Sequence, residues 1–129
     1  MRIPRDRWLP LKDLRITPEG RWESSVRLGP SSEWFSGHFD EYPLVPGVAL
    51  LALAAETVKR RGREQGRLLE VSGFSGVRFK RLVFPDEKLL ISVVAMPPGS
   101  EAKLDFHVTC HGNTVVRGVL KAAEELSGG

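Results

Sequence analysis

The sequence predicts one α+β domain in which an antiparallel sheet packs against a single buried helix. Three observations predict this class: an apolar helical stretch at residues 46–61, strand-like alternation before it, and strand-like segments alone after it. The order of two strands, a loop, a helix and four strands favours consecutive antiparallel pairing. A chain of 129 residues holds one such domain, spanning 1–129, with 1–10 and 124–129 expected to be loosely ordered.

The N-terminal part predicts a hairpin. A short strand is expected around Leu14 and Ile16, and residues 17–20 (Thr-Pro-Glu-Gly) are typical of a turn, because proline presets φ and glycine closes it. The next strand should place residues 22, 24, 26 and 28 toward the core, and the intervening charged residues and Ser25 toward solvent. Residues 29–45 predict a long loop, a kind of loop that tends to be functional.

The helix that follows has recognisable signals at both ends. Pro46 suits the first helical position, the basic residues 59–61 complement the C-terminal dipole, and Gly62 can supply a left-handed stop. Residues 48–55 are all apolar, which indicates a helix surrounded by protein.

The remainder predicts four strands, at about 68–79, 88–95, 103–110 and 114–122. Gly73 and Gly76 indicate a bulge in the first of these, and a turn is expected around Gly112. Cys110 falls on the apolar side of its strand, where packing in the core is the expected role.

Composition narrows the possible functions. An apolar share of 41% and a charged share of 27% are those of a globular protein, and the longest apolar run is too short to span a membrane. The N-terminus lacks the apolar segment of a secretory signal, and one cysteine excludes an internal disulfide and suits the cytoplasm. The net charge of +3 accompanies no nucleic-acid-binding module. We therefore expect no nucleic-acid partner, no membrane span, no metal and no cofactor; His107 and His111 are expected to be solvated histidines rather than ligands.

The candidate site lies where the long loop meets the helix. His38 follows Gly37 between the aromatic residues Phe35 and Phe39, shortly before Gly47 opens the helix. A helix N-terminus presents unpaired N–H groups and a partial positive charge, and imidazole is the natural base near neutral pH. A base facing fixed N–H donors suits removal of a proton beside a carbonyl and stabilisation of the oxyanion that develops.

Two stretches resemble the hotdog-fold 3-hydroxyacyl-[acyl-carrier-protein] dehydratases. Phe35 to Val48 is similar to the signature aromatic-x-Gly-His-Phe-x-x-x-Pro-x-x-Pro-Gly-Val, and residues 78–86 (Arg-Phe-Lys-Arg-Leu-Val-Phe-Pro-Asp) are similar to an Arg-Phe-Lys-Arg-Pro-like run. The likeness extends over about residues 11–122. It implies a hotdog fold, a curved antiparallel sheet wrapped around one long buried central helix. It also implies a homodimer or higher even oligomer whose sheets join edge to edge, and an acyl-thioester substrate carried by acyl carrier protein.

The resemblance also assigns roles to individual residues. His38 falls on the catalytic histidine and Gly47 on the oxyanion-hole amide. The family's second catalytic group, a Glu or Asp five residues after that glycine, is replaced here by Ala52. The residues implied to line the substrate tunnel are Phe35, Phe39, Tyr42, Pro46, Val48 and Ala52, and those implied to contact the carrier protein are Arg78, Lys80 and Arg81.

The loss of the usual acid leaves alternatives open. Glu56 lies one turn beyond Ala52, roughly 6 Å along the same helix face, and could replace the acid. It could equally serve structure or the helix end, and His38 could act alone. The leading hypothesis is a dehydratase that converts a 3-hydroxyacyl thioester to a trans-2-enoyl thioester in fatty-acid or related lipid biosynthesis. The alternatives are a non-catalytic acyl-thioester- or acyl-carrier-binding hotdog subunit, and an acyl thioesterase.

Overall fold

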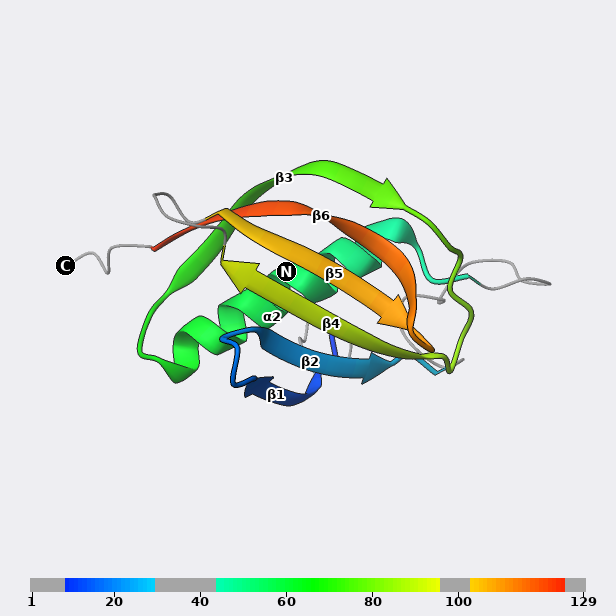
Figure 1. Ribbon diagram of the computed structural model, residues 1–129, viewed down its shortest axis with the longest axis horizontal. Coiled ribbons are helices and arrows are strands. Elements are labelled where there is room, and N and C mark those ends of the chain that lie inside the picture. Colours follow the sequence, from blue (N-terminus) through cyan, green and yellow to red (C-terminus); the bar gives the residue numbers. More distant parts are fainter. Residues whose placement is uncertain (1–8, 30–43, 96–102, 125–129) are drawn as a thin grey trace, which may run out of the picture.

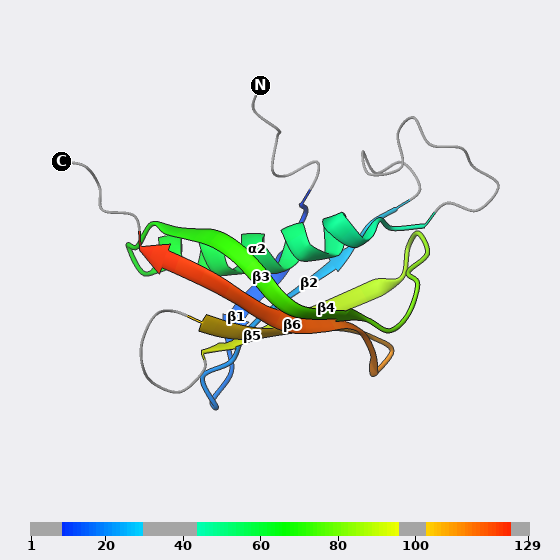
Figure 2. The same cartoon turned by 90° about the horizontal axis from the view of Figure 1, so that it is seen from above.

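A computed structural model describes residues 9–29, 44–95 and 103–124, which form six strands and one long helix (Figure 1). The elements are β1 (Lys12–Ile16), β2 (Trp22–Arg27), α2 (Gly47–Glu64), β3 (Leu69–Phe79), β4 (Lys88–Ala95), β5 (Lys103–Cys110) and β6 (Asn113–Glu124). The strands form one antiparallel sheet, and α2 lies across one of its faces (Figure 2). The predicted α+β arrangement of a curved sheet and a central helix is confirmed.

The strand order is β1-β2-β4-β5-β6-β3, which corrects part of the predicted pairing. Consecutive pairing holds for β1 with β2, β4 with β5 and β5 with β6. It is wrong for β3, which pairs with β6 and forms an edge of the described sheet, while β4 pairs with β2. The reason is that the chain leaves α2 at the far edge of the sheet, and the segment between β3 and β4 carries it back to the middle.

The predicted hairpin of β1 and β2 is present, but its solvent face is not as expected. The Gly20 N–H donates to the Thr17 carbonyl at 2.8 Å, and Gly20 adopts a left-handed φ of +88°. Glu23 and Ser25, expected in solvent, are buried. Arg15 of the neighbouring strand β1 lies 2.9 Å from the Glu23 carboxylate, and Asp13 lies 3.2 Å from the Ser25 hydroxyl, so polar side chains of β1 pack against both residues.

The ends of α2 differ slightly from the prediction. Pro46 is the residue before the helix rather than its first residue, with an extended backbone. Gly62, expected to stop the helix, is buried inside the last turn, and Gly66 takes the left-handed conformation instead (φ +74°). Gly62 is needed for close approach, because a Cβ there would lie 2.8 Å from the Leu69 side chain. No helix of the described residues is long and apolar enough to cross a membrane.

One side of α2 packs on the sheet. Leu53, Ala54 and Val58 are fully buried and belong to the same apolar core as Ile91 and Phe106 of the sheet. Burial of each large apolar side chain stabilises the fold by about 1.5–3 kcal/mol, so this contact stabilises the packing of α2 on the sheet.

A buried hydrogen bond fixes the position of α2 along the sheet. The Thr57 hydroxyl donates to the Leu53 carbonyl at 2.9 Å, and the Ser24 hydroxyl of β2 lies 2.7 Å from Thr57 Oγ1. Because the Thr57 proton is already engaged, Ser24 is the donor across the helix–sheet contact.

The opposite side of α2 has no described element over it. Val48 is 63% exposed, and Leu51, Ala52 and Ala55 are half-buried. The expectation that protein surrounds this stretch is therefore not met within the described residues, because a single sheet covers one side of a helix.

The remaining local predictions are confirmed. The register of β3 against β6 shifts between Val71 and Gly73 and again between Ser75 and Arg78, as expected for a bulged strand. Cys110 is buried. Strand β6 runs to Glu124, which pairs with Leu69 at the start of β3.

The close approach at Gly62 gives a stability test. Gly62→Ala should lower the free energy of unfolding by about 1–3 kcal/mol, because overpacking against Leu69 outweighs the gain of about 1 kcal/mol in helix propensity. Urea unfolding followed by circular dichroism measures this. Gly73→Ala is the matched control, since no atom lies within 4 Å of its new Cβ. A free energy of unfolding of Gly62→Ala equal to or higher than that of the parent would contradict the packing argument.

Candidate active site at the start of helix α2

The motif loop falls outside the described residues. His38, Phe35, Phe39 and Tyr42 lie between residues 30 and 43, so their assigned roles stay predictions. What the structure describes is the surface that this loop leads into, the start of α2.

The first turn of α2 has backbone N–H donors that find no acceptor in the part of the chain that the structure describes. Pro46 provides no side-chain cap, and the first turn contains no acidic residue. The Pro46 carbonyl accepts the N–H of Ala49 at 2.9 Å, whereas the N–H groups of Gly47 and Val48 have no acceptor among the described residues. The helix dipole adds a partial positive charge at this end, so a developing oxyanion would be stabilised here.

The aromatic ring of Phe79 lies beside these donors. A Cβ at position 47 would lie 3.1 Å from the Phe79 ring, so glycine is what allows the end of β3 to approach the helix start. Phe79 is 52% exposed, and Val48, Leu82 and Phe84 also expose much of their surface. An acyl chain is the kind of ligand that such a surface accommodates.

The segment between β3 and β4 is joined to the chain just before the helix. The Val45 N–H donates to the Val83 carbonyl at 2.8 Å, so the backbone that enters α2 is held by residues 80–87. The position of the Gly47 amide therefore depends on how rigid this segment is.

An ion pair stiffens that segment. Arg81 Nη1 and Nη2 lie 3.1 and 2.7 Å from the two carboxylate oxygens of Glu87, and the Phe84 N–H donates to Oε1 at 2.9 Å. The hydrogen bonds from Arg81 and from the Phe84 backbone lower the pKa of Glu87 to about 2. Arg81, expected to contact a carrier protein, thus already has a partner within the chain, and the sequence analysis did not anticipate this bidentate pair.

Arg78 and Lys80 differ from Arg81. Both are exposed, and neither has an ion-pair partner among the described residues. They remain available to an acidic partner, as the resemblance implies.

Glu56 lies away from the helix start. Nine residues separate it from Gly47, which corresponds to about 14 Å along the axis. Its side chain is buried, and Oε2 accepts from Arg60 Nε at 2.8 Å and Arg63 Nη2 at 3.3 Å. Arg60 also donates to the Leu9 carbonyl at 2.8 Å, so this network ties the N-terminal segment to α2. The arrangement favours the structural alternative, and the acid role stays a prediction.

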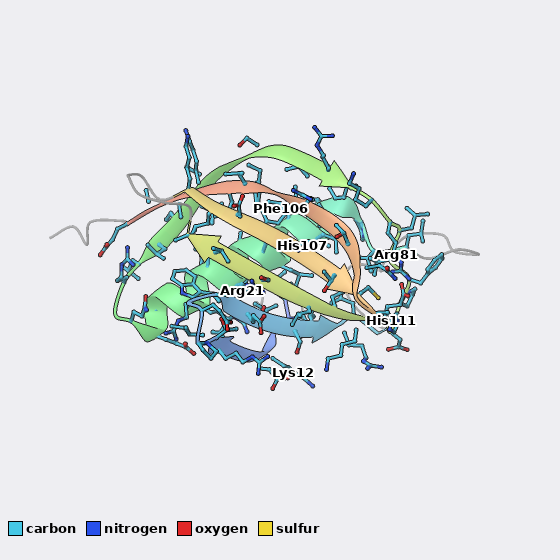
Figure 3. All side chains as sticks on the ribbon, in the orientation of Figure 1. Lys12, Arg21, Arg81, Phe106, His107 and His111 are labelled. Atoms are coloured by element: carbon cyan, nitrogen blue, oxygen red, sulfur yellow. The ribbon has the colours of Figure 1, made fainter. Side chains whose placement is uncertain are left out.

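A second polar group lies at the end of the sheet. Ligand atoms of Glu87, Cys110 and His111 come within 4.8 Å of one another, and Figure 3 shows Arg81 and His111 near the same end. Arg81 already occupies both oxygens of Glu87, and burial raises the pKa of the Cys110 thiol, which favours its protonated form. We therefore describe this group as an ion pair beside a thiol and not as a metal centre.

Comparison with known proteins places the chain among dehydratases. The family model described as ApeI-like, ApeI dehydratase, matches residues 15–119. The chain belongs to this ApeI-like dehydratase family. The 3-hydroxyacyl-[acyl-carrier-protein] dehydratase FabZ of Listeria welshimeri is 31% identical over 103 residues, which cover 75% of this chain and 72% of the relative.

Solved structures with the same fold include a dehydratase heterocomplex and proteins described as hypothetical thioesterases. The dehydratase heterocomplex ApeI:P of Xenorhabdus doucetiae matches with a TM-score of 0.67 at 21% identity, covering 88% of this chain and 96% of that one. A hypothetical thioesterase with coenzyme A from Streptococcus pneumoniae matches with a TM-score of 0.67 at 16% identity, covering 88% and 86%. At these identities the structures show the fold alone, and the hotdog fold expected from the sequence is confirmed.

The Arg81–Glu87 pair predicts a pH dependence of stability in this family member. Folding lowers the pKa of Glu87 from 4.5 to about 2. The contribution of this carboxylate to the free energy of unfolding is therefore present above about pH 4.5 and is lost as the pH falls toward 2. Glu87→Gln should be less stable than the parent at pH 7, with the difference shrinking between pH 4.5 and 2. Chemical unfolding across this range measures it.

Glu124→Gln is the matched control, since it removes one carboxylate from the more exposed pair with Arg67. A constant difference between the parent and Glu87→Gln from pH 7 to 2 would contradict the prediction.

Proposed function

We propose that this protein removes water from a 3-hydroxyacyl thioester to give a trans-2-enoyl thioester, in fatty-acid or related lipid biosynthesis. The observation that carries the proposal is the pair of N–H groups at Gly47 and Val48, which have no acceptor among the described residues and follow the Gly-His-Phe motif in an ApeI-like dehydratase. The similarity to FabZ supports the same substrate class.

In the proposed reaction, the neutral imidazole of His38 removes a proton from C2 of the substrate. The negative charge that develops on the thioester oxygen is stabilised by the Gly47 N–H and the positive end of the α2 dipole. The electron pair then forms the C2=C3 bond, and the C3–O bond breaks. The departing hydroxyl takes a proton, from a separate acid or from His38 itself, and leaves as water.

The proposed substrate is held by the apolar surface around the helix start and by charge outside it. Val48, Ala52 and Pro46 line the acyl group beside Phe79 in this proposal. Arg78 and Lys80 attract the acidic acyl carrier protein, because they are exposed and unpaired within the described chain. Arg81 supports this surface through Glu87.

The second candidate function is a non-catalytic subunit that binds the acyl thioester. One observation favours it: Ala52 stands where the family carries its acid, and Glu56 is engaged by two arginines. A thioesterase, the third candidate, shares the fold alone.

We infer that the working protein is a homodimer in the cytoplasm. Two surfaces that a second copy could cover are the side of α2 that no described element covers and the edge of β3 that is unpaired in the described sheet. A free buried Cys110 suits a reducing compartment. Sedimentation velocity at assay concentrations should give the mass of two chains or a larger even number. A monomer would contradict the inference.

Turnover tests the proposed reaction. Purified protein with a trans-2-enoyl thioester should catalyse hydration, followed by loss of enoyl absorbance, and His38→Ala should slow turnover roughly 10²- to 10⁴-fold because it removes the general base. His111→Ala is the matched control, since His111 is exposed and lies on the turn after β5. Absence of turnover, or turnover unaffected by His38→Ala, rejects the dehydratase and leaves the binding subunit.

Glu56→Gln in the same assay decides between the two roles of Glu56. The structural role predicts a turnover rate close to that of the parent, with a free energy of unfolding lower by about 1–3 kcal/mol, because Arg60 and Arg63 lose a charged partner. Turnover slowed by roughly two orders of magnitude or more at unchanged stability would instead identify Glu56 as the acid.

A further inference from the structure

A hollow of about 700 Å³ lies on the face of the sheet that points away from α2. It is formed by β3, β5 and β6, and its polar lining comes from Arg78, Lys80, Asp105, His107 and Arg117. These residues are exposed, and on β5 they alternate with core residues such as Phe106. The hollow is therefore separated by the thickness of the sheet from the surface at the start of α2.

The backbone itself makes this hollow. Ser75 lies opposite Val119 and Arg78 lies opposite Arg117, so Gly76 and Val77 together face the single residue Gly118. A Cβ at Gly118 would lie 3.0 Å from the Phe106 ring and 3.1 Å from the Val77 Cα, and Gly76 has a φ of +59°. A bulge flanked by two glycines deforms the sheet without depending on flexible side chains.

The register concentrates positive charge around the bulge. Arg117 lies directly opposite Arg78 on one neighbouring strand and opposite His107 on the other. Like charges in such positions destabilise a sheet, and Asp105 is the one carboxylate in the lining. Arg78, Lys80 and Arg117 have no ion-pair partner among the described residues, whereas Arg15, Arg60, Arg61, Arg63, Arg67 and Arg81 are each paired with a glutamate.

His107 lies among these cations and is hydrogen-bonded to a neighbouring strand. Its Nε2 lies 2.7 Å from Thr114 Oγ1, and partial burial together with the nearby Arg117 and Arg21 guanidinium groups lowers its pKa. Burial is the larger cause of this shift, and the two nearby cations add to it in the same direction.

We propose that this hollow binds a phosphate group, monoester or diester, through Arg78 and Arg117 as two-pronged donors and Lys80 as a third cation. Guanidinium groups match the geometry of phosphate oxygens, and a glycine-lined bulge lets an anion approach the backbone closely. The inference does not depend on dehydratase activity, since the site lies on the other face of the sheet.

The phosphate could be free or part of a larger molecule. Arg78 is next to Phe79, whose ring packs against Gly47, so the hollow and the start of α2 meet at the end of the edge strand β3. A thioester ligand that carries a phosphate on a pantetheine arm is one source of such a group. The shared chemistry is the phosphate group, and the source is a separate arm of the experiment.

The test titrates the full-length protein with inorganic phosphate at constant ionic strength, with sodium chloride as balance. The His107 imidazole resonance, assigned with His107→Gln, should shift to a plateau, and its pKa should rise because the bound anion offsets Arg117 and Arg21. Arg117→Gln and Arg78→Gln should each weaken phosphate binding about tenfold.

Lys121→Gln is the matched control, because Lys121 lies exposed on β6 outside the hollow lining. It should bind phosphate as the parent does. Three results would overturn the site. The first is a shift of the His107 resonance that chloride reproduces, and the second is a shift that reaches no plateau. The third is an equal loss of phosphate affinity in Lys121→Gln and Arg117→Gln.

Phosphopantetheine and pantetheine identify the source. Tighter binding of phosphopantetheine than of inorganic phosphate, with loss of affinity in Arg117→Gln, indicates a phosphate carried on the arm; equal affinity indicates free phosphate. Pantetheine that shifts His107 as strongly as phosphopantetheine would overturn the proposal. No turnover is measured, so failure here is distinct from failure of the dehydration assay.

Discussion

The packing of α2 across one face of the sheet is the constraint on which the candidate site depends. Ser24 and Thr57 fix the helix along its axis, and the buried residues around Leu53 fix its rotation. The helix start is thereby held against the end of β3, with its first N–H groups uncapped among the described residues. Four donors at every helix start lack intrahelical partners, so a protein that leaves them uncapped beside an apolar surface keeps them available to a ligand.

The segment after β3 fixes the backbone just before the helix start. Val45 and Val83 share a backbone hydrogen bond, and the segment that contains Val83 is closed by Arg81 and Glu87. A charge-assisted bidentate pair restricts a loop more than a single neutral hydrogen bond does. The position of the Gly47 amide thus rests on three layers: core packing, a backbone hydrogen bond and an ion pair.

Sequence reasoning predicted the elements better than their partners. The helix, the hairpin turn and the bulges follow from local patterns, so they could be predicted from Pro46, Gly20 and Gly76. The predicted helix stop at Gly62 was wrong, because a glycine is needed there for the close approach of the Leu69 side chain, which belongs to another element. The pairing of β3 with β6 and of Arg81 with Glu87 depends on the path of the chain, which local periodicity does not contain. At the site, the helix start was predictable, whereas the availability of Arg78 and the engagement of Arg81 required coordinates.

The end of β3 shows how a few adjacent residues can serve both faces of a sheet. Successive side chains of a strand point to opposite faces, so Phe79 packs at the helix start while Arg78 and Lys80 line the outer hollow. Arg81, where the strand has ended, turns to Glu87 instead. The run of residues 78–81, read as one basic patch in the sequence, is therefore divided into an apolar contact, an unpaired cationic surface and a structural ion pair. Because these residues are consecutive, the helix start and the outer hollow both adjoin the end of the same edge strand, on opposite faces of the sheet.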